Sequence, residues 1–368
     1  MKFNAIKEPF LKGINTVSKA INTKTAIPAL SNILITSEKN NIKLTASDLH
    51  VTITAKIGAD VESEGSITVP GKLLSSFVSQ IAAEKLSCQL DGENFKVQTP
   101  KIKSSFATIN ADEFPGVEIL HEGNLLKLKS DEFSKALQHI QFVPAMSDSR
   151  PVLTGIYIKI ASGKLIMAAT DGFRMVEYVL NANSGDLDIS CIVPAKVFVD
   201  IAKIFCAEED QIDLYINKDK NVVGLKVNNM EAQLRMLDGD YPNYRAIIPA
   251  EFTNKAEMDK NSLGNGIKLA SIFSKDYDNM IKISQTADLI EIKSQPTESG
   301  SNSSQVDGTF AGTPIDIAFN AKYMIDFVNN VSGEKIIMES NEPLKPTAFR
   351  SSDNTDFIYI VMPMRASW

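Results

Sequence analysis

The sequence has 368 residues, of which 43% are hydrophobic and 23% charged, and its formal net charge is -7. These values are typical of a globular protein and exclude disordered, collagen-like and disulfide-scaffold classes. The length predicts two or three domains, each large enough to bury its own core, because domains usually span about 100 to 200 residues.

The first third of the chain predicts two helices and several strands. Phe10, Ile14 and Val17 have the spacing of one apolar helix face. A second helix is expected after the β-type run that starts at Ile67. Runs rich in β-branched and aromatic residues predict strands at 32–36, 43–46, 51–55, 95–98 and 104–108.

The middle third has the same kinds of element in a similar order. Helices are expected to begin near Asp131 and near Pro194. Strands are expected at 155–160, 164–168 and 174–180. Because strands are many and helices few, the sequence indicates α+β domains with antiparallel sheets.

Three segments resemble one another, and they begin at Ile67 (ITVPGKLLSSFVSQI), Cys191 (CIVPAKVFVDIAKIF) and Ile317 (IAFNAKYMIDFVNNV). The lysines at the equivalent position are Lys72, Lys196 and Lys322. The stripe of the first helix recurs in the same register, and its copies are Phe133, Leu137 and Ile140, then Leu263, Ile267 and Ala270. Two independent segments in one register predict a threefold repeat, with domains at 1–122, 127–248 and 249–368.

The sequence offers little catalytic chemistry. It contains no phosphate-binding loop, dinucleotide fingerprint, HExxH or GxSxG motif, and its three histidines are scattered, so no cofactor or metal is expected. Asp48 and Asp171 occupy the same repeat position, which favours a role in strand-end turns over metal ligation. A metal-dependent phosphoryl-transfer enzyme that uses these two carboxylates stays open as an alternative.

Three further segments each have two interpretations. ATDGFRM (169–175) fits a plain turn or a phosphate-binding turn, and PNYRAIIP (242–249) fits a stiff linker or part of a site. The segment at 357–368 begins as a strand, and its Met-Pro-Met run could close a core or line an adaptable peptide groove.

Four segments in order resemble the bacterial β sliding clamp, the processivity factor of the replicative DNA polymerase: MKF at the start, ATDGFRM, DGDYPNYRAIIP from Asp238 and YIVMPMR from Tyr359. The resemblance covers essentially the whole length. It implies three repeated clamp-type domains, each with antiparallel sheets outside and two helices inside, and a closed ring made by a head-to-tail dimer. A monomeric peptide-binding scaffold stays open as a third possibility.

The resemblance also implies a function without chemistry. The ring would encircle double-stranded DNA without sequence preference and confer processivity on the polymerase. It would recruit the polymerase catalytic subunit, the clamp loader and repair proteins through a short linear motif. The residues expected to contact DNA are Lys24, Lys72, Arg150, Lys196 and Lys322, and those expected at the dimer interface are Phe106, Ile272 and Phe273.

A partner-peptide pocket between the second and third domains is the other implication of the resemblance. The matching positions are Leu153, Thr170, Gly172, Phe173, Arg174, Met175, Pro242, Ile247, Val361, Met362, Pro363, Met364 and Arg365. Leu153, Met175, Ile247 and Met362 are expected as apolar anchors, and Arg174 or Arg365 as the partner of a polar or acidic group of the motif. Ala246 and Phe173 depart from the family pattern, and Trp368 could cover or extend the pocket.

The location of the protein is expected to be the cytoplasm. The three cysteines are an odd number without metal-ligand spacing, which suits a reducing compartment. The first residues lack the apolar core of a secretory signal, and no window has the about 18 apolar residues of a membrane span.

Overall fold

The computed structural model describes residues 1–22, 25–116, 119, 123–147, 149–275, 278–296, 298, 300–366 and 368. The chain forms two compact units, Met1–Asp131 with Lys196–Met236, and Glu132–Ala195 with Leu237–Trp368. Six α-helices and many antiparallel strands lie in the described residues, which confirms the α+β class. In the same residues, no helix is long and apolar enough to cross a membrane.

The first unit is built on a twelve-stranded sheet. The main path of this sheet runs through β8 (Lys103–Ala107), β7 (Asn94–Gln98), β6 (Lys85–Asp91), β1 (Lys2–Ile6), β4 (Val51–Ser63), β16 (Met230–Arg235), β15 (Val222–Val227), β14 (Gln211–Asn217) and β9 (Asn124–Lys129). Off this path lie β2 (Asn32–Glu38), β3 (Asn41–Ser47) and β5 (Gly65–Pro70). The strand predicted at 51–55 extends to Ser63, because its second half pairs with β1 while its first half pairs with β16.

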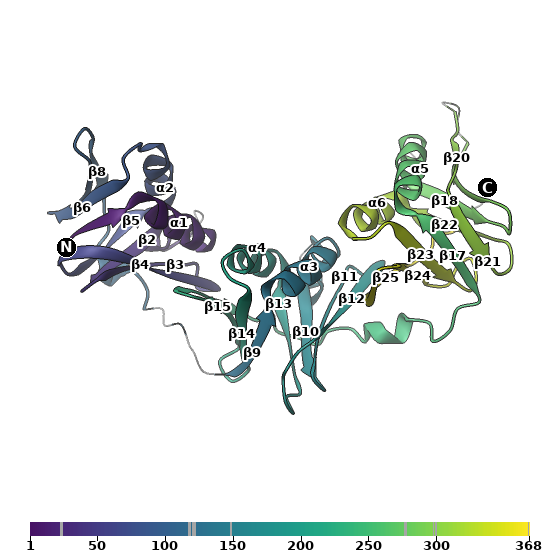
Figure 1. The fold of residues 1–368 in the computed structure, drawn as a ribbon, viewed down its shortest axis with the longest axis horizontal. Coiled ribbons are helices and arrows are strands. Elements are labelled where there is room, and N and C mark those ends of the chain that lie inside the picture. Colours follow the sequence, from purple (N-terminus) through teal and green to yellow (C-terminus); the bar gives the residue numbers. More distant parts are fainter. Residues whose placement is uncertain are drawn as a thin grey trace. The chain divides into compact units, whose positions relative to one another are not determined.

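The helices of the first unit are amphipathic and lie against its strands (Figure 1). They are α1 (Lys7–Val17), α2 (Gly71–Gln80) and most of α4 (Ala195–Cys206). Gly13 allows α1 to approach β4 closely, since a Cβ at this position would lie 2.4 Å from Cδ1 of Ile57. The predicted stripe of Phe10, Ile14 and Val17 is fully buried.

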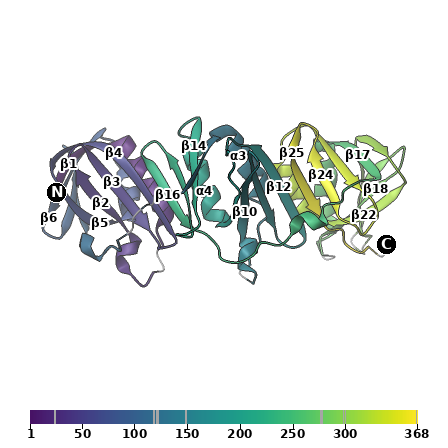
Figure 2. The ribbon, with the colours of Figure 1, turned by 90° about the horizontal axis from the view of Figure 1, so that it is seen from below.

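The second unit contains two sheets. The nine-stranded sheet runs through β13 (Ile189–Pro194), β10 (Gly155–Ala161), β11 (Lys164–Thr170), β12 (Arg174–Asn181), β25 (Asn354–Val361), β24 (Thr347–Ser351), β23 (Lys335–Ser340), β17 (Asn254–Asp259) and β21 (Gly308–Ala311). The four-stranded sheet runs through β20 (Ser303–Gln305), β19 (Ile290–Ser294), β18 (Met280–Gln285) and β22 (Ile315–Asn320). Figure 2 shows β25 and β24 side by side, and β25 joins the middle and last thirds by pairing with β12.

The helices of the second unit are α3 (Ser130–Ile140), of which all but the first two residues belong to it, α5 (Lys260–Phe273) and α6 (Ala321–Asn330). Where α3 meets β12 and β25, the ring of His139 lies 4.8 Å from that of Phe357 and 5.4 Å from that of Tyr178. Nδ1 of His139 lies 2.6 Å from the Lys135 carbonyl oxygen. His139 is therefore a core histidine at a junction of elements.

The threefold repeat is visible in the elements themselves. Lys72, Lys196 and Lys322 each occupy the second position of a helix, in α2, α4 and α6. All nine residues of the repeated apolar stripe are fully buried. The repeat and the compact units divide the chain differently, because 132–195 and 196–236 of the middle third belong to different units.

Candidate functional site

The turn between β11 and β12 is held by its own polar side chains. Oδ1 of Asp171 accepts hydrogen bonds from the backbone N–H groups of Phe173 (2.9 Å) and Arg174 (3.1 Å). The Thr170 hydroxyl donates to the Arg174 carbonyl (2.7 Å) and accepts from the Gly172 N–H (3.1 Å). Gly172 has a φ of 94°, a conformation that favours glycine. The turn therefore presents Phe173 and Arg174 in a defined orientation.

Asp48 makes the equivalent turn in the first third. Its Oδ1 accepts from the backbone N–H groups of His50 (3.0 Å) and Val51 (2.7 Å). This geometry confirms the turn interpretation for both aspartates. In the described part of the chain, no three His, Cys, Asp or Glu side chains are grouped so that they could hold a metal ion.

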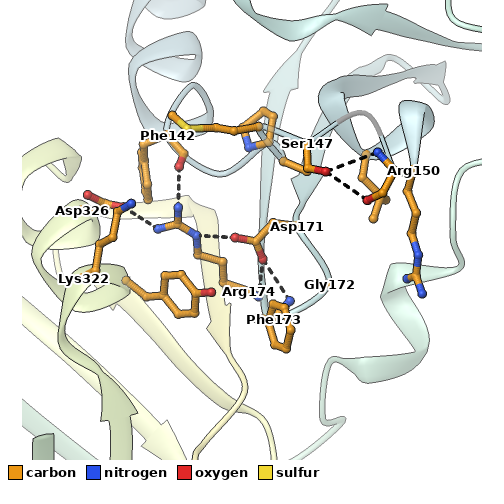
Figure 3. A pocket seen from close by; sticks show the side chains of 15 residues that line it. Phe142, Ser147, Arg150, Asp171, Gly172, Phe173, Arg174, Lys322 and Asp326 are labelled. Atoms are coloured by element: carbon orange, nitrogen blue, oxygen red, sulfur yellow. Dashed lines mark hydrogen bonds and ion pairs between the residues drawn. The ribbon is translucent and has the colours of Figure 1, made fainter. Parts of the chain in front are cut away.

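Arg174 is the centre of a buried ionic cluster (Figure 3). Its side chain is only 7% exposed, and each guanidinium nitrogen has an acceptor. Nε donates to Asp171 Oδ2 (3.0 Å), Nη1 to Asp326 Oδ2 (2.7 Å) and Nη2 to the Phe142 carbonyl (2.8 Å). The guanidinium also lies 4.5 Å from the centre of the Tyr323 ring, which is a cation–π contact.

The geometry leaves Arg174 little access to a polar or acidic group of a partner, and this role stays a prediction for Arg174 or Arg365. Three of its five N–H donors are used by two carboxylates and a carbonyl, and little of the side chain is accessible. The cluster instead joins the β11–β12 turn of the middle third to α6 of the last third. Sequence reasoning missed Phe142, Tyr323 and Asp326, because they come from segments far apart in the chain.

A pocket of about 840 Å³ lies beside this cluster. Its lining residues are Phe142, Pro144, Ala145, Met146, Ser147, Ser149, Arg150, Leu153, Asp171, Gly172, Phe173, Arg174, Lys322, Tyr323 and Asp326. Four of the residues expected at the partner pocket are among them: Leu153, Gly172, Phe173 and Arg174. Two residues expected to contact DNA, Arg150 and Lys322, also line it, and they lie on opposite sides of the cluster in Figure 3.

The accessible wall of the pocket is apolar with cations at its margin. Phe173 is 63% exposed and Met146 is 99% exposed, which is unusual for large apolar side chains. Arg150 and Lys322 are exposed, and neither side chain has an ion pair within the described residues. The pocket can therefore take an extended apolar segment, and a negative charge at its edge would meet these cations.

Two expected apolar contacts lie behind the pocket instead of in it. Met175 and Val361 have no exposed surface. Met175 packs in a core cluster with Tyr244 and Ile360, among others. In this structure Met175 of β12 and Val361 of β25 are core residues, and their direct contact with a partner stays a prediction.

Two expected residues lie on the segment that connects the middle and last thirds. Pro242 is exposed and Ile247 is 38% exposed, and neither lines the pocket. The segment is held through Glu177 of β12, whose Oε2 accepts from the Tyr244 hydroxyl (2.6 Å) and from Nε of Arg245 (2.8 Å). The linker interpretation of PNYRAIIP therefore fits these contacts better than that of a pocket wall.

The chain after β25 runs from the pocket turn to the four-stranded sheet. The Met362 N–H donates to the Phe173 carbonyl (2.9 Å), and the Met364 N–H donates to the Ala318 carbonyl of β22 (2.8 Å). Pro363 is half-buried and Arg365 is exposed. The hydrogen bond between Met362 and the backbone of Phe173 therefore connects these residues to the pocket.

Of the expected DNA contacts, Lys72, Lys196 and Lys322 lie on α-helices, whereas Arg150 precedes the short 3-10 helix Pro151–Thr154. Lys72 and Lys196 are exposed on α2 and α4, and Lys24 lies outside the described residues. The six helices carry nine lysines against five acidic residues, a net charge of +4, although the whole chain carries -7. Part of this charge is neutralised, because Lys12 forms an ion pair with Glu208.

The expected dimer contacts are only partly at the surface. Ile272 of α5 is 61% exposed, but Phe106 is 5% exposed and packs edge-on against Phe77, with 5.3 Å between ring centres. Phe106 therefore lies beneath Phe77 and contributes little to the exposed surface itself. Sequence reasoning missed Leu73 (58% exposed) and Leu269 (48% exposed), which lie outside the buried helix stripes.

The chain matches three family models in order. They describe the N-terminal domain (residues 1–118), the central domain (127–243) and the C-terminal domain (245–365) of the DNA polymerase III beta subunit. The chain belongs to the DNA polymerase III beta subunit family. Members of this family are non-catalytic processivity factors of DNA polymerase III, so the alternative of a phosphoryl-transfer enzyme is set aside.

Similar proteins agree with this family over the whole chain. A beta sliding clamp of Staphylococcus aureus is 25% identical and covers 99% of each chain. The sliding clamp structure from Bacillus subtilis has a TM-score of 0.94 at 23% identity and covers 100% of this chain and 99% of its own. A Pseudomonas aeruginosa clamp bound to griselimycin has a TM-score of 0.94 at 22% identity and covers 100% of both chains.

Proposed function

We propose that this protein is a DNA sliding clamp, which encircles duplex DNA and gives the replicative polymerase its processivity. The observation that carries the proposal is the match to all three beta-subunit domains in order along the chain. The domain boundaries 1–122, 127–248 and 249–368 belong to this proposal. A head-to-tail dimer would place six such domains in one closed ring.

The distribution of charge supports sliding on DNA. The helices carry a net positive charge within an acidic chain, and their cations are all lysines. Lysine meets phosphates as a flexible point charge and does not read base edges, so contact would be independent of sequence. Lys72 and Lys196 are the best candidates, because both are exposed on helices and neither lines the pocket.

The ring interface is proposed to use exposed apolar residues of α2 and α5. Leu73 is exposed and Phe77 half-buried on α2, and Phe106 packs edge-on against Phe77. Ile272 and Leu269 are the exposed apolar residues of α5. Burial of these side chains against a second copy would remove them from water, which stabilises association.

The partner site is proposed to be the pocket around Phe173, entered by a short linear motif of polymerase, clamp-loader and repair proteins. Phe173 and Met146 provide exposed apolar surface, and Leu153 forms part of the floor. Arg150 and Lys322 would attract an acidic residue of the motif. We place the protein in the cytoplasm, where it would meet replicating DNA.

Ring closure is tested on nicked circular DNA. The protein is loaded with its clamp loader and ATP, free protein is removed, and retention is measured before and after the circle is linearised. A clamp stays on the circle and leaves the linear DNA within minutes. Equal retention on both forms would show ordinary binding and would contradict the proposal.

The partner pocket is tested with a fluorescein-labelled peptide that carries the clamp-binding motif of a replicative polymerase. Phe173→Ala should weaken binding about tenfold or more, as expected for truncation of a central aromatic contact. Leu344→Ala is the matched control, because Leu344 is 51% exposed in the same unit and does not line the pocket. Equal affinities of the two variants would place the partner site elsewhere.

A further inference from the structure

We propose that Trp368 anchors the segment 362–366, the C-terminal strap, to the four-stranded sheet, and that this anchoring positions Phe173 in the pocket. The inference rests on the proposed partner pocket. It gives Trp368 a role that is neither a lid nor a wall, because Trp368 is not among the residues that line the pocket.

The path of the strap connects the pocket turn to the sheet. At one end, the Met362 N–H donates to the carbonyl of Phe173 (2.9 Å), the exposed aromatic residue of the pocket. Two residues later, the Met364 N–H donates to the carbonyl of Ala318 on β22 (2.8 Å). A change at one end of this short segment can therefore reach the backbone of Phe173.

The anchor is a contact between Trp368 and Lys282 of β18. Nζ of Lys282 lies 4.6 Å from the centre of the indole ring and donates to the backbone oxygen of Trp368 (2.9 Å). The Lys282 side chain is 14% exposed and also pairs with Asp316 of β22 (3.4 Å). A partly desolvated cation over tryptophan is the more favourable form of a cation–π contact.

The two attachments of the strap fall on neighbouring positions of the sheet. Lys282 and Ala318 are cross-strand partners in the β18–β22 pair, so their side chains lie on the same face. Trp368 and Met364 thus hold the strap at one place on β18 and β22. This arrangement explains how a residue outside the pocket can keep the strap in register.

The packing of Trp368 against Lys282, its docked state, has one unfavourable feature. Its indole nitrogen is buried and has no hydrogen-bond partner in the described residues. A buried donor without an acceptor weakens the docked state. The ring, and not the N–H, therefore provides the contact, and phenylalanine should replace tryptophan at this position.

The experiment uses the full chain and four variants: Trp368→Ala, Trp368→Phe, Lys282→Met and Lys293→Met. Lys293 is the matched control, because it is the cross-strand partner of Lys282 on β19 and pairs with Glu291 (2.8 Å). Hydrogen exchange is measured at the amides of Met362 and Met364. Affinity is measured with the fluorescein-labelled polymerase peptide, and folding by circular dichroism.

Trp368→Ala and Lys282→Met should speed hydrogen exchange at the amides of Met362 and Met364. They should also weaken peptide binding about two- to fivefold, the loss expected for one cation–π contact. Trp368→Phe and Lys293→Met should match the original protein in both measurements. Since Trp368 is the only tryptophan of the sequence, its fluorescence should also change in Lys282→Met and not in Lys293→Met.

Two results would contradict the proposal that Trp368 anchors the strap. Unchanged exchange at Met362 and Met364 in Trp368→Ala would show that the residue anchors nothing. Tighter peptide binding in that variant would show that Trp368 occludes the site. If the original protein does not bind the peptide at all, the proposed partner pocket fails, while hydrogen exchange still decides whether Trp368 holds the strap.

Discussion

Replacement of Arg174 by methionine tests whether this residue is part of the framework or a direct contact of the partner. The substitution keeps an unbranched apolar stem and removes three charge-assisted hydrogen bonds, to Asp171, Asp326 and the Phe142 carbonyl. It also removes the cation over Tyr323. If the cluster is structural, the main effect falls on stability.

The size of the stability loss depends on the two carboxylates that lose their cation. Removal of one partner from a buried ion pair typically costs about 3 to 5 kcal/mol, because the remaining charge is uncompensated. Here Asp171 and Asp326 retain 16% and 28% exposure, so water can reach both carboxylates. We therefore expect the lower end of the range, about 3 kcal/mol.

Urea unfolding, monitored by the fluorescence of Trp368, measures this loss of stability in the second unit, to which the single tryptophan belongs. Arg350→Met is the control, because Arg350 pairs with Glu339 (3.2 Å) at 31% exposure and should cost at most about 1 kcal/mol. In a double-mutant cycle, Asp326→Asn should lose less stability when Arg174 is already methionine. If Arg174→Met unfolds like the original protein but no longer binds the polymerase peptide, the framework role is refuted.

Ile272→Ala combined with Phe273→Ala should give folded monomers in sedimentation velocity, because each buried apolar side chain is worth about 1.5 to 3 kcal/mol and a ring has two interfaces; a dimer of unchanged mass would remove these residues from the interface. Lys72→Ala or Lys196→Ala should weaken retention on all DNA sequences alike and lower the salt slope by about 1; sequence-dependent loss would contradict a phosphate contact. Burial lowers the pKa of His139 below its ordinary value of 6.5, so the unfolded chain binds this proton more readily and stability should fall as the pH drops below 6.5 towards the folded-state pKa. This part of the pH dependence should vanish in His139→Gln, and a variant that keeps it would exclude His139 as the cause.

Local patterns in the sequence predicted much of the fold. The stripe that contains Phe10 and Ile14 is buried, because helical spacing alone determines which residues share a face. Asp48 and Asp171 cap turns as expected, since an aspartate can bond the backbone two and three residues later without help from distant segments. Both results depend on short stretches of chain.

The site was less predictable, because its residues are brought together by tertiary contacts. The motif predicts that Arg174 is available to a partner, but Asp326 and Phe142, from other parts of the chain, accept hydrogen bonds from it. The motif predicts Met175 as a pocket residue, but β12 is covered on both faces where it begins. Phe106 is similarly covered by Phe77 of α2, which no pattern within β8 indicates.

The charge of the chain shows how a total can mislead about a partner. With +4 on the helices and -7 in all, the strands and loops together carry -11, so the net charge of the helices is opposite in sign to that of the rest of the chain. DNA is repelled by the acidic elements and attracted by the helices, which favours binding only where helices surround it. In a ring lined by these helices, a modest positive charge is sufficient, because topological closure retains the DNA and the lysines only need to keep contact with phosphates weak enough to slide.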